Sequence, residues 1–198
     1  MVTGAGIITA LGAGWNLNAA GFRAGKSAFR PVTLFDVSRQ RTKIAAEIDL
    51  PEDLPATLLS KKCQRRLNRA ARMLLLAAHE AWTQSGWQPQ ENLPVVLGTT
   101  SGEMSLGQDY LRQAVGAPHR SKAPPTRAAY YQAQRQARDV CEAFGFQGPV
   151  TIIANACASG ANAVGHAWEL VRTGRAEKVL TGGYDALCHL TFAGFDSL

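Results

Sequence analysis

The segment that decides the fold is VTIIANACASGANAVG, residues 150–165 of the chain. Its first five residues, VTIIA, are mostly apolar and rich in β-branched side chains, which predicts a buried strand over 150–154. A helix is predicted next, over 157–173, ending at Gly174. Cys157 therefore stands at a helix N-terminus, where unpaired backbone N–H groups and the helix dipole favour negative charge. That position favours a nucleophilic thiolate and offers N–H groups to an oxyanion.

A purely structural interpretation of Cys157 stays open, because a free cysteine often behaves as a small buried hydrophobe. At helical spacing, one face of the 157–173 segment carries Cys157, Ala161, Val164, Trp168 and Val171. The opposite face carries Asn162, His166, Glu169 and Thr173. Residues 158–161 are all small, which leaves room for a substrate beside the thiol or for close helix packing.

Strands and helices alternate along the rest of the chain, which is typical of an α/β layered sheet. The predicted strands are the end of a strand at residues 1–3, then 43–48, 95–98 and 178–187. The predicted helices are 60–85, capped by Ser60 and stopped by Gly86, then 103–115 and 127–144. Residues 51–55 and 116–126 are predicted loops, and residues 99–102 a turn.

Composition excludes several classes of protein. With 46% apolar and 18% charged residues in 198, the chain is not disordered, collagen-like or a coiled coil. Its longest apolar run, residues 73–78, is far shorter than the ~20 residues that cross a bilayer. No basic residue precedes Arg23, so no secretory leader is recognised. We expect a cytosolic protein that does not bind a membrane.

The four cysteines lack metal-site or disulfide spacing, so we expect reduced thiols and no metal site. They are Cys63, Cys141, Cys157 and Cys188. Near the N-terminus, the Gly4-Ala5-Gly6 sequence is not a dinucleotide fingerprint, because Thr9 stands where the third glycine belongs. We interpret these two glycines as parts of a tight turn.

A basic cluster occupies the first turns of the predicted 60–85 helix. Its members are Lys61, Lys62, Arg65, Arg66, Arg69 and Arg72. Cations are unfavourable at a helix N-terminus, so either this is a solvated basic face or it binds an acidic partner. Nucleic acid is not the expected partner, because no aromatic residues alternate with these charges and no recognition motif accompanies them.

Residues 154–165 closely resemble the active-site segment of the β-ketoacyl-[acyl-carrier-protein] synthases, the condensing enzymes of fatty acid and polyketide synthesis. Other stretches match that family in the same order. They are VTGAG (residues 2–6), Gly148-Pro149, GGYD (residues 182–185), Gly194-Phe195 and Ser197-Leu198.

The resemblance implies a thiolase-like α/β fold, the N-terminal half of a five-layer αβαβα architecture with a mixed sheet. Residues 1–198 would be this half, and the second half would be absent. In the family, two histidines, a lysine and the second oxyanion N–H lie in that second half. This half alone is therefore expected not to complete condensation. The resemblance also implies a homodimer or a heterodimer with a paralogous chain.

The resemblance assigns roles to six residues. Cys157 would accept an acyl group from a carrier-protein thioester, and a carbanion from decarboxylating malonyl-carrier protein would then attack the acyl-enzyme. Lys62, Arg65 and Arg66 would dock the acidic acyl carrier protein. Phe195 would line the acyl pocket and Ser101 would bound it, although core or loop roles fit these two equally well. No cofactor is expected, because phosphopantetheine on the carrier holds the substrates.

Two other functions remain open. One is a non-catalytic partner subunit that binds carrier protein and shapes the chain-length pocket, although such a partner does not need the thiol. The other is a degradative thiolase-type enzyme using coenzyme A thioesters, which the basic cluster disfavours. A departure from the family pattern is the polar surface of the 127–144 helix, in the region where the family forms its dimer interface and acyl pocket.

None of the histidines is expected to act as a base for Cys157. His166 lies on the opposite side of the helix from the thiol, His79 lies within the basic helix, and His119 lies in a proline-flanked loop. Only His189, after the last strand, is not excluded by local geometry.

Overall fold

The computed structural model describes residues 1–88, 92–116 and 129–198. The chain divides into two compact units. The sheet unit comprises Thr57–Ala71 and Pro89–Ala186, and the hairpin unit comprises Met1–Ala56, Arg72–Gln88 and Leu187–Leu198. Among the described residues, no helix is long and apolar enough to cross a membrane.

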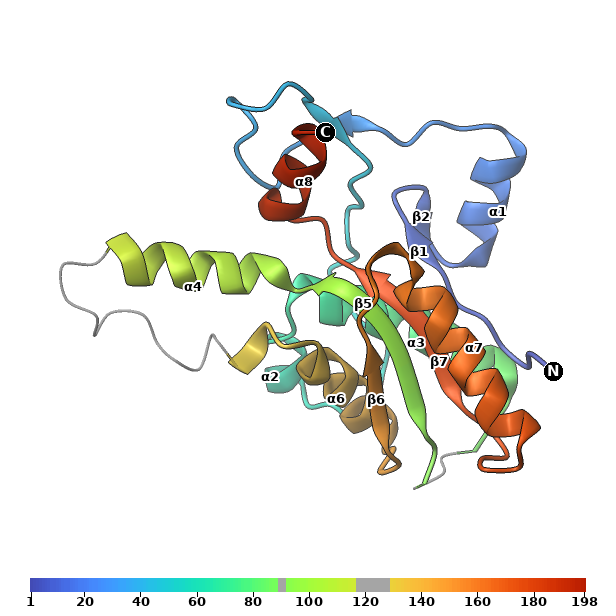
Figure 1. Cartoon of the computed structure of the whole chain (residues 1–198). Coiled ribbons are helices and arrows are strands. Elements are labelled where there is room, and N and C mark those ends of the chain that lie inside the picture. Colours follow the sequence, from blue (N-terminus) through green and yellow to red (C-terminus); the bar gives the residue numbers. More distant parts are fainter. Residues whose placement is uncertain (89–91, 117–128) are drawn as a thin grey trace. The chain divides into compact units, whose positions relative to one another are not determined.

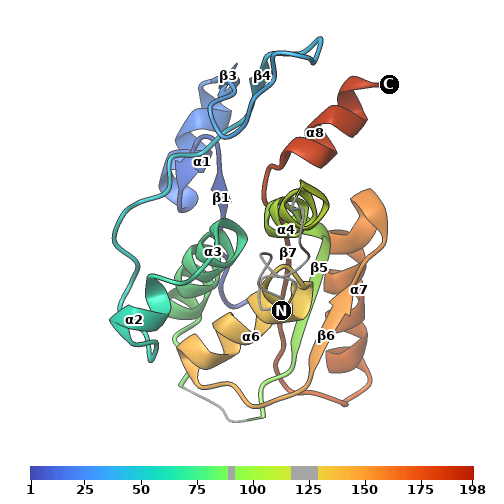
Figure 2. The ribbon, with the colours of Figure 1, turned by 90° about the vertical axis from the view of Figure 1, so that its left-hand side faces the viewer.

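The sheet unit is built on three parallel strands in the order β6-β5-β7. The central strand β5 (Val95–Gly102) lies between β6 (Val150–Ile153) and β7 (Leu180–Asp185). Figures 1 and 2 show α7 (Ser159–Arg172) on one face of the sheet and α6 (Ala133–Phe144) on the other. This layering confirms the α/β prediction.

Side-chain size explains how the two helices pack on the sheet. The buried residues of α7 are Ser159, Ala163 and Ala167, which recur every four residues and are small enough for the helix to lie close to the strands. Between the helices, β5 contributes the fully buried Val95, Val96 and Leu97. The core of this unit is therefore a central apolar strand covered on both faces.

The hairpin unit contains two short antiparallel strand pairs, β1 with β2 and β3 with β4. Its strands are β1 (Ile8–Thr9), β2 (Gly12–Ala13), β3 (Arg30–Pro31) and β4 (Ile44–Ala45). Its helices are α1 (Trp15–Arg23), α8 (His189–Asp196) and most of α3 (Arg69–Ser85). The Glu80 carboxylate of α3 accepts hydrogen bonds from the Ile7 and Trp15 N–H groups, which ties the N-terminal segment to that helix.

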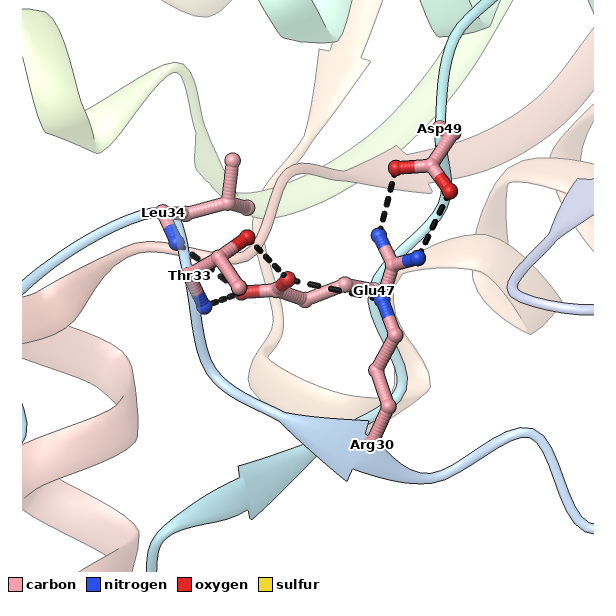
Figure 3. A network of polar contacts seen from close by, with 5 residues as sticks. All are labelled: Arg30, Thr33, Leu34, Glu47 and Asp49. Carbon is pink, nitrogen blue, oxygen red and sulfur yellow. Dashed lines mark hydrogen bonds and ion pairs between the residues drawn. The ribbon is translucent and has the colours of Figure 1, made fainter.

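A buried carboxylate organises the β3–β4 region (Figure 3). Glu47 is 3% exposed and accepts hydrogen bonds from the Thr33 and Leu34 N–H groups and the Thr33 hydroxyl. The Arg30 guanidinium lies 3.6 Å from Glu47 and makes two bonds to Asp49. Burial raises the pKa of Glu47. The hydrogen bonds and the Arg30 charge lower it by more than burial raises it, so the pKa lies below its ordinary value.

The predicted 60–85 helix is two helices, because the backbone tightens after α2 (Lys61–Gln64). The Arg66 and Leu67 N–H groups bond to carbonyls only three residues back. The Asn68 side chain then accepts a hydrogen bond from the Ala71 N–H and caps the N-terminus of the next helix, α3. The Ser60 cap is confirmed, since its hydroxyl accepts from the Cys63 N–H. The Gly86 stop is also confirmed, with a left-handed φ of 65°.

The predicted strand end at residues 1–3 is wrong, and so is the tight turn assigned to Gly4 and Gly6. The Ala5 N–H is donated to the Gln84 side chain of α3 instead of to a neighbouring strand. A Cβ at Gly6 would lie 1.9 Å from the Ala77 carbonyl oxygen. These glycines therefore permit close approach to α3.

Two further predictions differ in their boundaries. Helix α4 (Met104–Gly116) is shifted by one residue from the predicted 103–115. The predicted 127–144 helix ends correctly at Phe144, but α6 begins at Ala133 because Gln132 is extended. Of its polar residues, Gln136 and Asp139 are buried, so the surface is less polar than the sequence suggested. The predicted 116–126 loop, Arg127 and His119 lie outside the described residues, except Gly116, the last residue of α4.

Candidate active site

Cys157 lies in a single 3₁₀ turn (Ala156–Ala158) between β6 and α7. The sequence predicted this junction, although it placed Cys157 in the helix itself, whereas α7 begins at Ser159. The Cys157 residue is exposed, which contradicts its interpretation as a buried hydrophobe. The N–H groups that follow it are used within the turn, since the Ala158 N–H donates to the Asn155 carbonyl and the Ser159 N–H donates to the Ala156 carbonyl. Cys157 is therefore an exposed residue in a hydrogen-bonded turn directly before α7.

The backbone at this turn is strained. Ala156 has a φ of 44°, a positive value that residues other than glycine rarely adopt. Among the described residues, it is the only non-glycine residue with a positive φ. Conformations of this kind cost about 1–3 kcal/mol and persist only where the surroundings hold them. The strain falls on the residue directly before Cys157, so it fixes the direction in which the thiol leaves the backbone.

Two hydroxyl groups hold the strained turn. The Ala156 carbonyl accepts from the Ser159 hydroxyl at 2.7 Å and from the Thr100 hydroxyl at 2.9 Å. The Ser159 oxygen also accepts from the Asn155 N–H at 2.7 Å and lies 3.1 Å from the Thr100 oxygen. Residues on both sides of Cys157 are thus tied to one another and to β5.

Two glycines, Gly98 and Gly183, let the start of α7 lie directly on the strands. A Cβ at Gly98 of β5 would lie 2.1 Å from the Ser159 carbonyl oxygen. A Cβ at Gly183 of β7 would lie 2.9 Å from the Cα of Gly160. Real Cβ atoms do not tolerate such distances to backbone, so only glycine permits this approach. The 3₁₀ turn that carries Cys157 (Ala156–Ala158), called the cysteine turn from here on, is therefore placed on the sheet by close backbone contact.

Ser101 lies in the same unit as Cys157, in the last part of β5. The sequence predicted a turn at residues 99–102, but the strand continues to Gly102 because Asp185 accepts backbone hydrogen bonds there. The Ser101 N–H is one of these donors, at 2.6 Å. The role of Ser101 in bounding an acyl pocket stays a prediction.

Phe195 belongs to the hairpin unit, on α8, and its side chain is 67% exposed. Its neighbour Asp196 accepts hydrogen bonds from the Arg41 and Thr42 N–H groups, which fixes this end of α8 within the unit. The contribution of Phe195 to an acyl pocket stays a prediction as well.

His189 is half-buried in the hairpin unit. Its Nε2 lies 3.0 Å from the Gln40 side-chain nitrogen, and its ring makes a T-shaped contact with the Phe35 ring. Its neighbours are those of a hydrogen-bonded structural histidine. His79 and His166 are half-buried on α3 and α7.

The basic cluster is smaller than the sequence suggested. Lys61, Lys62, Arg65 and Arg66 are exposed, on α2 and the turn that follows it, and we keep the name basic cluster for these four. Arg72 is engaged elsewhere, because its guanidinium donates to the Pro51 and Glu52 carbonyls. The predicted docking residues Lys62, Arg65 and Arg66 thus remain together, in the same unit as Cys157.

The predicted apolar face of the 157–173 segment does not face the sheet. Val164, Trp168 and Val171 are between 43% and 63% exposed. The Arg172 guanidinium lies over the Trp168 ring and pairs with Glu169. This face of α7 is therefore apolar and open.

Sequence reasoning missed the residues that hold the cysteine turn. Asp185 was noted only within the GGYD motif, and Thr100 only within a predicted turn. Their partners are more than fifty residues away along the chain, so local pattern carries no signal for them. A threonine two residues after the predicted strand 95–98 and an aspartate near the end of the predicted strand 178–187 were the only local indications.

Fold and site together define a class of α/β proteins that present a cysteine thiol in a tight turn at the start of a helix. Within that class, the chain belongs to the β-ketoacyl synthase family, since residues 1–198 match the family's N-terminal domain. Among the residues that the structure describes, no three histidine, cysteine or acidic side chains are placed to hold a metal ion.

Curated relatives agree with this assignment. The tetracenomycin polyketide synthase ketoacyl synthase alpha subunit of Streptomyces glaucescens is 33% identical over 212 residues, which cover 100% of this chain and 48% of that protein. The 3-oxoacyl-[acyl-carrier-protein] synthase 2 of Rhizobium meliloti (strain 1021) is 28% identical over 206 residues, covering 98% of this chain and 49% of that protein. The chain thus spans about half the length of these relatives.

Solved structures give the same fold. The ishigamide ketosynthase/chain length factor superposes with a TM-score of 0.86 and 27% identity, over 99% of this chain and 49% of that one. A β-ketoacyl synthase from Burkholderia phymatum STM815 gives a TM-score of 0.80 and 25% identity, over 99% and 49%. The expected thiolase-like fold class is confirmed.

Proposed function

We propose that this chain is the nucleophile-bearing N-terminal half of a 3-oxoacyl-[acyl-carrier-protein] synthase of fatty acid or polyketide synthesis, acting in the cytosol. The observation that carries the proposal is the exposed Cys157 in a strained turn at the start of α7. A condensing enzyme needs a thiol of this kind, accessible to a carrier-bound thioester.

The first step is acyl transfer to Cys157. Its thiolate attacks the thioester carbonyl and forms a new carbon–sulfur bond. The tetrahedral oxyanion is stabilised by the Cys157 N–H, a donor of the first turn. Collapse of this intermediate breaks the bond to the phosphopantetheine sulfur, which leaves as a thiolate and takes up a proton.

The second step forms the carbon–carbon bond. Malonyl-carrier protein loses CO₂, and the resulting carbanion attacks the acyl carbonyl on Cys157. The Cys157 thiolate leaves, and the product is a 3-oxoacyl chain longer by two carbons. In the family, the histidines and lysine that assist this step lie in a second half, so condensation requires groups beyond residues 1–198.

The partner we infer for the basic cluster is the acidic acyl carrier protein. Lys62, Arg65 and Arg66 are exposed and lie in the same unit as Cys157. Exposed positive charge steers an acidic partner and orients its encounter. The relative from Rhizobium meliloti takes its name from an acyl-carrier-protein substrate. A homodimer or a heterodimer with a paralogous chain would complete the assembly.

The test is acyl loading followed by intact-protein mass spectrometry. Wild-type protein incubated with acyl-carrier protein should gain one acyl group, and the Cys157→Ala variant should gain none. Cys63→Ala is the matched control, because Cys63 is also exposed and lies in the same unit. If Cys157→Ala still loads, the proposed function is wrong. If acyl-CoA loads the protein and acyl-carrier protein does not, a thiolase-type enzyme is the better assignment.

The second candidate is a non-catalytic partner subunit that binds carrier protein and shapes the chain-length pocket. One observation favours it: the structural neighbour with a TM-score of 0.86 pairs a ketosynthase with a chain length factor. Such a subunit would take up no acyl group on Cys157. In that case, Cys157→Ala would leave the activity of the assembled heterodimer unchanged.

A further inference from the structure

The strained cysteine turn is held by a chain of side-chain contacts that starts on β7. One oxygen of Asp185 accepts from the N–H groups of Thr100, Ser101 and Gly102, at 3.1, 2.6 and 2.9 Å. The same oxygen accepts from the Thr99 hydroxyl at 2.7 Å. Four donors on one carboxylate oxygen fix the course of the last residues of β5.

Thr100 connects this fixed part of β5 to the cysteine turn. Its hydroxyl donates to the carbonyl of Ala156, the residue with a φ of 44°. Its oxygen also lies 3.1 Å from the Ser159 oxygen. Thr100 therefore contacts both residues that flank the 157–158 segment, and it does so from a strand that Asp185 holds.

Proton counting shows what Thr100 adds. The Ser159 and Thr100 hydroxyls carry two protons for three close oxygen–oxygen contacts. Without the Thr100 hydroxyl, Ser159 can still donate to the Ala156 carbonyl, so the turn keeps one tether. The turn then loses its side-chain hydrogen bond to β5, although the backbone contact at Gly98 remains. Ala156 is then freer to relax toward a common backbone conformation.

We propose that Thr100 is a positioning residue for the Cys157 nucleophile and that Asp185 fixes Thr100 in turn. The inference rests on the proposed role of Cys157 in acyl transfer. Thr100 acts through the Ala156 carbonyl, by holding the backbone conformation that aims the thiol and places the Cys157 N–H toward the oxyanion.

The test compares two substitutions at Thr100 in the full chain. Thr100→Val has the same shape but lacks the hydroxyl, whereas Thr100→Ser keeps it. Misplacing a reactive group by about 1 Å can cost up to about a hundredfold in rate. We expect Thr100→Val to slow acyl loading by about tenfold to a hundredfold, with little change in the KM for acyl-carrier protein. Thr100→Ser should stay within about threefold of wild type.

Iodoacetamide gives a readout that does not depend on the carrier. We expect alkylation of Cys157 at a fixed pH, followed by peptide mass spectrometry, to proceed at a different rate in Thr100→Val than in wild type. The reason is that a relaxed turn changes how the thiol is presented to the reagent. Thr100→Ser should restore the wild-type rate.

Thr181→Val is the matched control. It makes the same chemical change in the same sheet, on β7, at a buried hydroxyl that has no hydrogen-bond partner among the described residues. It should leave loading and alkylation unchanged. Asp185→Asn should slow loading by less than Thr100→Val, because an amide oxygen still accepts but more weakly than a carboxylate.

The outcomes separate this inference from the proposed function. If Cys157→Ala is inactive while Thr100→Val is loaded and alkylated at the wild-type rates, the positioning role is wrong and the proposed function stands. If Thr100→Ser loses as much activity as Thr100→Val, the hydroxyl is not what matters and the inference also fails. If Cys157→Ala loads normally, the proposed function itself fails.

Discussion

Asp139 is a buried carboxyl whose charge is only partly compensated. It is 5% exposed on α6 and lies 2.7 Å from the Arg135 guanidinium. Burial raises its pKa to about 6, and the Arg135 charge does not offset that effect. A buried ion pair can cost more in desolvation than it returns in attraction. At the scale of single residues, this pair is therefore expected to destabilise the ionised protein.

This imbalance predicts the effect of Asp139→Asn. The folded pKa of Asp139 is above its ordinary 3.8, so the folded state holds the proton more tightly and its stability falls as pH rises from about 4 to about 6. An asparagine has no such dependence. We expect Asp139→Asn to match wild type at acid pH and to be more stable by about 1–3 kcal/mol at neutral pH.

Urea unfolding at several pH values measures this difference. Glu142→Gln is the control, because Glu142 is a half-exposed neighbour on the same helix, 4.0 Å from the same arginine. It should change stability by less than about 1 kcal/mol at any pH. A neutral-pH loss of stability in Asp139→Asn would show that the ion pair with Arg135 is net favourable.

At the scale of elements, the contact between α7 and the sheet depends on the absence of a side chain at Gly98. A Cβ there would meet the Ser159 carbonyl at 2.1 Å, so Gly98→Ala must push the start of α7 away from β5. We expect a loss of about 1–3 kcal/mol in the free energy of unfolding. Acyl loading should fall as well, because the displaced segment carries the cysteine turn.

Gly182→Ala is the matched control for this prediction. Gly182 lies in the same sheet, on β7, and a Cβ there would meet nothing within 4 Å. Thermal unfolding and acyl loading of the two variants should therefore differ clearly. Equal effects would mean that glycine is needed in these strands for a reason other than helix approach.

The sequence predicted helices and strands correctly where apolar residues recur at the spacing of a helix or a strand. It failed where the hydrogen bonds of a single side chain, such as Asn68 or Asp185, start a helix or extend a strand. The strand–cysteine–helix order was correct because residues 150–153 and 159–172 have clear strand and helix patterns. The break after Gln64 was missed because Asn68 starts a new helix inside an otherwise helical pattern. The extension of β5 was missed because its acceptor, Asp185, lies more than eighty residues further along the chain.

The candidate site shows the same division. Cys157 and the basic cluster could be predicted from the sequence, because each is recognised from adjacent residues at the predicted start of a helix. The contacts of Thr100 and Asp185 are not, because they depend on the parallel pairing of β5 with β7. Local chemistry therefore identifies the reactive group, whereas the groups that hold it emerge only from the tertiary structure.

At the scale of the whole molecule, positive charge is unevenly distributed. The chain carries 21 lysines and arginines against 15 acidic residues, a net charge of +6. The segment Thr57–Ala71 contains no acidic residue and includes the basic cluster. Fields from such clusters extend about 8–10 Å at physiological salt. An acidic carrier protein would therefore feel the cluster locally, as well as the net charge.

Charge reversal separates the local effect from the global one. Arg65→Glu and Arg175→Glu change the net charge equally, and both residues are exposed in the sheet unit. Arg175 follows the C-terminal end of α7, whereas Cys157 precedes its N-terminal end. We expect Arg65→Glu to raise the KM for acyl-carrier protein about tenfold, with little change in the loading rate at saturation. Arg175→Glu should raise it far less.

The same loading experiment is repeated at low and high ionic strength. Steering by exposed charges weakens as ionic strength rises, so the difference between Arg65→Glu and wild type should shrink in high salt. Steady-state loading kinetics at low and high salt measure both quantities. Equal defects in Arg65→Glu and Arg175→Glu would mean that only net charge attracts the carrier. A defect that persists at high salt would instead point to a short-range contact made by Arg65, because screening does not remove a direct hydrogen bond.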